Sequence, residues 1–192
     1  MKTKSMIKSI AVVLALFVAT TVAAQSKADL KTAQKEAKTF AKEGWKVNTG
    51  YLSLAEQIAL SKPILREQEK WVIGEARTTA SYYDAARSNA LMSAKVNIAK
   101  AVEEQMGGVE ELLRGTQYEG QAPAISVGKH KEVAKSRFAS EVNHPKMLMD
   151  CYRDLKNGNV EVLIRVAIPL DQAKNSYAKQ LMKELDEMSK NQ

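Results

Sequence analysis

The sequence predicts an α+β fold, in which a small and mainly antiparallel sheet packs on one long helix, with additional helices at both ends. Two observations support this prediction. A strand-like run at 71–77 leads directly into an alanine-rich helical pattern that reaches about residue 106. Farther along, strand-like runs at 147–155 and 160–168 flank Asn157-Gly158, a dipeptide typical of tight β-hairpin turns.

The first 24 residues have the features of a secretory signal peptide. Three lysines precede an apolar run of about ten residues, and Val22-Ala23-Ala24 supplies small residues for cleavage. The run is shorter than the roughly 20 residues that a spanning helix needs, so a retained anchor is the less favoured interpretation. We expect an exported protein, in the periplasm or on the periplasmic side of the outer membrane, with no transmembrane segment in the mature chain.

Residues 25–69 are expected to form an N-terminal helical segment. Its first helix covers 27–42 and ends at Gly44, and Ser53 caps a second helix that is kinked or broken near Pro63. One face of the first helix is a basic stripe, which is either a solvated surface or an electrostatic contact to acidic lipid head groups or cell-wall polymer. The stripe consists of Lys27, Lys31, Lys35, Lys38 and Lys42.

The net charge gives little support for a nucleic-acid partner. The whole chain carries a formal charge of +7, and loss of the three N-terminal lysines would leave about +4. A dedicated nucleic-acid-binding protein is usually more basic than this.

The long central helix is expected to lie close to the sheet. Ala90 and Ala94 fall in the middle of its apolar stripe, where alanine permits a short distance between helix and sheet. Ser81 is the expected N-cap, and Gly107-Gly108 is the expected stop.

Beyond this helix the pattern weakens. Residues 107–129 are expected to be irregular, and a short helix is expected over 130–142. A final helix, in the segment 169–192, is capped by Asp171.

The hairpin register follows from the turn. If Asn157-Gly158 forms a two-residue turn, Cys151 lies opposite Ile164 on the core face, and Tyr152 lies opposite Leu163 on the other face. The thiol would then be buried and inert. The second face would offer a surface to a partner, unless one of the chain's own terminal helices covers it. Its apolar members are Tyr152, Leu163 and Leu148.

Two stretches together resemble a known family. They are Gly74-Glu75-Ala76 with Tyr83-Asp84-Ala85-Ala86, and the hairpin run from Cys151 to Val162. Residues 70–168 resemble the small outer-membrane lipoprotein family of the twenty-kilodalton Lpp type, and also the N-terminal domain of the flagellar T-ring protein. The resemblance implies an α/β domain in the cell envelope with no catalytic residues. The chain lacks the lipidated cysteine of that family.

The reactive side chains do not form a recognisable catalytic or metal-binding pattern. His130, His144 and Cys151 have no compact zinc spacing, so no metal or cofactor is expected. On the second hairpin face, Asp150 would pair with Arg165, and Asp154 would lie opposite Glu161 as a solvated like-charge pair.

Three functions remain open. The leading interpretation is a non-catalytic envelope protein that acts by contact with another protein or with the cell wall. A second is a peripheral binder of anionic surfaces through the lysine stripe. A third is a hydrolase with an unrecognised site.

Overall fold

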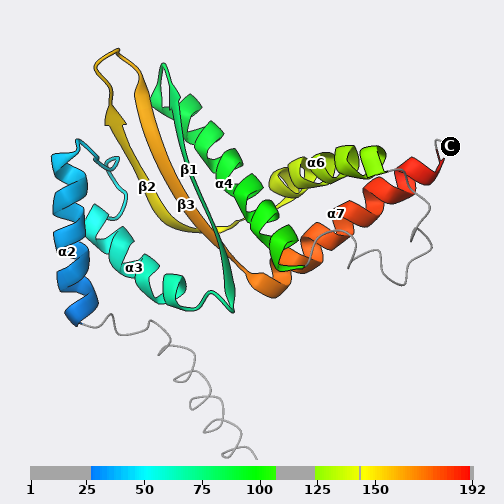
Figure 1. Cartoon of the computed structure of the whole chain (residues 1–192). Coiled ribbons are helices and arrows are strands. Elements are labelled where there is room, and N and C mark those ends of the chain that lie inside the picture. Colours follow the sequence, from blue (N-terminus) through cyan, green and yellow to red (C-terminus); the bar gives the residue numbers. More distant parts are fainter. Residues whose placement is uncertain (1–26, 107–123, 143, 191–192) are drawn as a thin grey trace, which may run out of the picture.

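The computed structural model describes residues 27–106, 124–142 and 144–190, and it confirms the predicted α+β class. A three-stranded antiparallel sheet lies between two groups of helices (Figure 1). The expected signal peptide and the segment 107–123 lie outside the described residues. The elements are α2 (Lys27–Lys42), α3 (Leu54–Arg66), β1 (Trp71–Ala80), α4 (Tyr83–Gln105), α6 (Ala124–Glu141), β2 (Lys146–Asp154), β3 (Val160–Pro169) and α7 (Leu170–Lys190).

The sheet has the order β1-β3-β2, so β3 is central and pairs with both neighbours. The turn between β2 and β3 has three residues and not two. The Gly158 N–H donates to the Leu155 carbonyl at 3.0 Å, and the Leu155 N–H donates to the Asn159 carbonyl at 2.8 Å. Gly158 has a φ of 83°, a left-handed conformation that glycine adopts without steric cost.

This turn makes the predicted register wrong by one residue. Cys151 lies opposite Leu163, and Tyr152 lies opposite Val162. Because alternate residues point to opposite faces, the one-residue shift moves Cys151 away from the α4 side of the sheet and places Tyr152 on it. The predicted pairing of Tyr152 with Leu163 is therefore wrong, and these two side chains lie on opposite faces.

Helix α4 packs closely on β1 and β3. Ala90 and Ala94 are fully buried, as predicted. Gly74 of β1 lies against the helix at Ala94, and a Cβ atom added there would be 2.0 Å from the Ala94 carbonyl oxygen. The predicted N-cap is wrong, because the cap position is Tyr82 and no side chain forms the capping hydrogen bond.

Helices α6 and α7 pack beside α4. Helix α6 is longer than predicted and begins at Ala124, within the segment that was expected to be irregular. Its Phe138 ring makes an edge contact with Tyr177 of α7, with ring centroids 6.1 Å apart. Both aromatic side chains are fully buried, so this contact joins the two helices through the core.

The other face of the sheet carries α2 and α3. Helix α2 has the predicted bounds, and Gly44 follows its end with a φ of 86°. Ser53 caps α3, as predicted, and the structure adds a reciprocal capping box with Glu56. Of the kink or break expected near Pro63, the break does not occur: α3 runs on to Arg66, because proline removes only one backbone donor near the end of the helix.

These two helices cover the predicted partner surface. Leu163 is fully buried, and Leu148 is 2% exposed. Leu163 packs in a second core with Trp45, Ile58 and Cys151. The chain's own N-terminal helices therefore occupy the position that a partner was expected to take.

Candidate functional site

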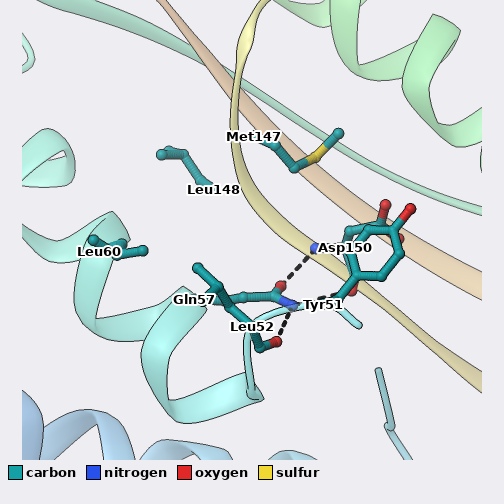
Figure 2. Close-up of a pocket in the computed structure, with 7 residues that line it drawn as sticks. All are labelled: Tyr51, Leu52, Gln57, Leu60, Met147, Leu148 and Asp150. Atoms are coloured by element: carbon teal, nitrogen blue, oxygen red, sulfur yellow. Dashed lines mark hydrogen bonds between the residues drawn. The ribbon is translucent and has the colours of Figure 1, made fainter. Parts of the chain in front are cut away.

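A pocket of about 220 Å³ lies between α3 and the outer edge of β2 (Figure 2). One wall comes from residues just before and within α3, and the other comes from the first half of β2. We call it the Tyr51 pocket. Its lining residues are Tyr51, Leu52, Gln57, Leu60, Met147, Leu148 and Asp150.

The mouth of the Tyr51 pocket is apolar. Of the seven large hydrophobic side chains that are exposed in the described part of the chain, four surround this pocket. They are 38–49% exposed. Single exposed hydrophobic side chains are ordinary, but a cluster of them around a concavity is typical of an interaction site. The four are Tyr51, Leu52, Leu60 and Met147.

The Gln57 amide forms the polar floor, and it is already paired (Figure 2). Its Nε2 donates to the Leu52 carbonyl at 2.7 Å and to the Asp150 carbonyl at 3.4 Å. Its Oε1 accepts from the Asp150 N–H at 2.8 Å. Gln57 thus binds the edge of β2 as a neighbouring strand would, and its polar atoms are engaged within the protein.

The Asp150 carboxylate is also paired, although it is only 2% exposed. Arg87 Nε of α4 donates to it at 2.7 Å, and the Tyr83 hydroxyl donates at 3.1 Å. Burial and the Asp150 charge raise the pKa of the Tyr83 phenol to about 12, so that phenol stays protonated and remains a donor. The sequence prediction that Asp150 pairs with Arg165 is wrong, because Ile164 lies opposite Asp150.

The outer edge of β2 is closed along most of its length. Lys46 and Tyr152 exchange both backbone hydrogen bonds at 2.8 Å. Gln57 pairs with Asp150, and the Ser61 hydroxyl donates to the Leu148 carbonyl at 3.2 Å. A partner cannot add a strand at these positions, so recognition at the Tyr51 pocket must use side chains.

The groups near the pocket do not form a catalytic pair. Cys151 is buried, as predicted, in the core that lies between the sheet and helices α2 and α3. Burial raises the pKa of its thiol to about 12. The Asp150 carboxylate is held by Arg87 and Tyr83. Within the described residues, no three His, Cys, Asp or Glu side chains come together as a group that could hold a metal ion. His144 is exposed, and the side chain of His130 lies outside the described residues.

The lysine stripe lies on α2, away from the lining of the Tyr51 pocket. The side chains described for it are exposed: Lys31, Lys35, Lys38 and Lys42. The side chain of Lys27 is not among those described. Of the predicted partner surface, only Leu148 lines the pocket, while Tyr152 is half-buried against Tyr83 with ring centroids 5.1 Å apart.

Sequence reasoning missed the Tyr51 pocket. Its walls come from segments almost a hundred residues apart, and no motif links them. One local signal was present: Tyr51 and Leu52 are two large apolar residues between a turn and the Ser53 cap of α3, outside any amphipathic pattern.

The described helices include none with the length and apolar character needed to cross a membrane. Comparison with known proteins adds no assignment: no family model, curated protein or solved structure matches the chain. The resemblance to the Lpp-type family remains a prediction, and the geometry of the site is the basis for the function proposed below.

Proposed function

We propose that this chain is a non-catalytic protein of the cell envelope that acts by contact with another protein, and that an apolar side chain of that partner enters the Tyr51 pocket. The observation that carries the proposal is the cluster of exposed hydrophobic side chains around a pocket whose two buried polar side chains, Gln57 and Asp150, are already paired. Export to the envelope is part of the proposal and rests on residues 1–24 of the sequence.

The chemistry of the pocket favours a protein partner over the cell wall. Cell-wall polymer is polar, and its recognition needs side chains with hydrogen-bonding capacity to offer. In the Tyr51 pocket, Gln57 and Asp150 bind other groups of the protein, whereas Leu52, Leu60 and Met147 present apolar surface. A side chain such as leucine or phenylalanine loses contact with water there without breaking the hydrogen bonds of Gln57 or Asp150.

The size of the pocket suits one side chain. A cavity of about 150 Å³ holds benzene, and sites for drug-sized ligands begin near 300 Å³. The Tyr51 pocket, at about 220 Å³, lies between these limits. Burial of one large apolar side chain contributes about 1.5–3 kcal/mol, so the pocket would act as an anchor within a wider contact.

The test is site-specific photocrosslinking in the native envelope. A photoreactive residue at Met147 should give one discrete crosslinked product, because this position lies at the pocket mouth. Met92 is the matched control, since it is the same residue type, is equally exposed at 38%, and lies on α4 away from the pocket. The same residue at Met92 should not give that product.

A second variant tests whether the pocket itself is needed. Leu60→Asp places a charge in the apolar wall and should abolish the Met147 product while leaving the melting temperature almost unchanged, because Leu60 is 41% exposed. A product that persists in Leu60→Asp, or that forms equally from Met92, would exclude the Tyr51 pocket as the contact site.

A further inference from the structure

We infer that the lysine stripe of α2, formed by Lys27, Lys31, Lys35, Lys38 and Lys42, is a docking surface for an anionic lipid bilayer. This inference goes beyond the proposed protein contact and rests on different residues. It would give the protein a second binding surface, with phospholipid head groups as the partner chemistry.

The stripe is separated from the acidic residues of its own helix. Helix α2 contains two acidic side chains, Asp29 and Glu36, and both bind α3. Arg66 Nη1 donates to Asp29 at 3.1 Å, and Lys62 Nζ lies 2.7 Å from Glu36. The negative charge of α2 is therefore directed toward α3 and neutralised there, while the positive charge lies on the outer surface.

The described lysines of the stripe are available to an external anion. Lys31, Lys35, Lys38 and Lys42 are exposed, and within the described part of the chain none of them forms an ion pair. Other cations of the protein, such as Arg87 and Arg137, are held by carboxylates. These four lysines are thus cations for which the fold supplies no counter-charge among the described residues.

The shape of the stripe favours a flat partner. Its lysines are spaced by three or four residues, so they share one face of a helix, and the stripe extends for about 22 Å. Helix α2 lies at the outside of the molecule, at the opposite end from α6 and α7 (Figure 1). A convex helix face can meet a bilayer along its whole length, whereas a linear polyanion is usually held in a groove.

The contact would be electrostatic and without deep insertion. Leu30 is the large apolar side chain of α2 that is exposed, at 38%, and Phe40 packs against Trp45 with ring centroids 6.2 Å apart. A helix that inserts into the acyl region needs a wide apolar face, and α2 uses its apolar face to cover the sheet. Binding should therefore weaken as salt screens the lysines.

The test uses the purified exported protein and vesicles of phosphatidylcholine with or without phosphatidylglycerol. Sedimentation should show binding only to the anionic vesicles, and release at about 0.5 M salt. The triple variant Lys31→Gln, Lys35→Gln, Lys38→Gln should bind roughly 100-fold more weakly, because each lysine near an anionic surface contributes several-fold to affinity. Glutamine is a good helix former, so α2 should remain folded.

The control variant removes equal charge elsewhere. Lys100→Gln, Lys156→Gln, Lys183→Gln neutralises three exposed lysines of α4, the hairpin turn and α7. It should retain most of the affinity, and so should Leu60→Asp, which disables only the Tyr51 pocket. Equal losses in both triple variants, equal binding to neutral vesicles, or no binding to either vesicle would overturn the inference.

Orientation gives an independent measurement. The native Cys151 is buried, so a fluorescent label can be directed to Gln34→Cys within the stripe or to Asn175→Cys on α7, both of which are exposed positions. Anionic vesicles should protect the label at position 34 from an aqueous quencher and leave the label at position 175 accessible. If the vesicles protect only the label at position 175 from the quencher, or protect neither label, α2 is not the surface in contact with the bilayer.

Discussion

Arg87 of the long helix α4 donates from Nε to Oδ2 of Asp150 on the edge strand β2 at 2.7 Å. The carboxylate is almost completely buried, while Arg87 keeps 29% of its side chain exposed. This ion pair connects the α4 face of the sheet to the strand that forms one wall of the Tyr51 pocket. Loss of Arg87 would leave the buried Asp150 charge with the Tyr83 hydroxyl as its one remaining side-chain partner among the described residues.

We therefore expect Arg87→Ala to lower the free energy of unfolding by about 3 kcal/mol, measured by urea denaturation. Tyr83→Phe, which removes only the neutral donor, should cost about 1 kcal/mol. A double-mutant cycle of Arg87→Ala with Asp150→Asn should show strong coupling. Additive effects would mean that the two side chains contribute independently to stability.

The buried thiol of Cys151 predicts a pH dependence of stability. Its pKa is raised to about 12 by burial, whereas a thiol in the unfolded chain titrates near pH 8.5. Above pH 8.5 the unfolded state loses a proton that the folded state keeps, so alkali favours unfolding. This contribution should lower the free energy of unfolding by up to about 1.4 kcal/mol per pH unit until the folded thiol also titrates.

Comparison with Cys151→Val isolates this contribution, because the buried tyrosines titrate in both proteins. The wild-type protein should lose stability faster than the variant as the pH rises above 8.5, and parallel curves would contradict the burial of the thiol. At neutral pH the native thiol should resist a thiol reagent until the protein unfolds.

The short distance between Gly74 and α4 predicts that even a methyl group is not tolerated there. In Gly74→Ala the new Cβ would lie 2.0 Å from the Ala94 carbonyl oxygen and 2.8 Å from Ile98 Cγ1, so the helix backbone must move. We expect a loss of about 3 kcal/mol in thermal or urea unfolding. Thr79→Ala, at an exposed position of the same strand, should change stability by less than about 0.5 kcal/mol.

The three-residue turn predicts that one residue can be removed. Deletion of Lys156 leaves Asn157-Gly158 as a two-residue turn between Leu155 and Asn159, which already pair. The strand register should stay the same, and nuclear Overhauser contacts between Cys151 and Leu163 should persist. Gly158→Ala, by contrast, should cost about 1 kcal/mol, because it places a Cβ on a residue with positive φ. A shifted set of contacts in the deletion variant would contradict the turn geometry.

Local patterns in the sequence predicted most of the fold. The bounds of α2, the Ser53 cap of α3, the hairpin and the buried alanines of α4 each depend on residues close together in the chain. The predicted register of the hairpin was wrong because the length of the turn depends on which of its residues adopts the left-handed conformation. The sequence already indicated a problem with that register, because it placed Asp154 opposite Glu161, an unfavourable pair of like charges. In the structure, Glu161 faces Arg153, whose Nε lies 2.6 Å from its carboxylate, and Asp154 binds Lys46.

The candidate site was harder to predict than the fold. The prediction placed the partner surface on the second face of the hairpin, but α2 and α3 cover that face, and their docking depends on contacts between distant segments. The pairing of Gln57 with the backbone of Asp150 is an example, because nothing near Gln57 in the sequence indicates that its amide will face a strand. The lysine stripe could be predicted from the sequence because the helical spacing of the lysines alone places them on one face.

The closure of the β2 edge by Lys46, Gln57 and Ser61 has a consequence for how the chain avoids aggregation. These three residues precede the start of β2 by about 85 to 100 positions, so synthesis from the N-terminus produces the protecting segment before the strand that it protects. An unprotected strand edge is a template for pairing between molecules. A fragment that begins at β1 would expose this edge and should self-associate, whereas the intact chain carries its own protection against that association.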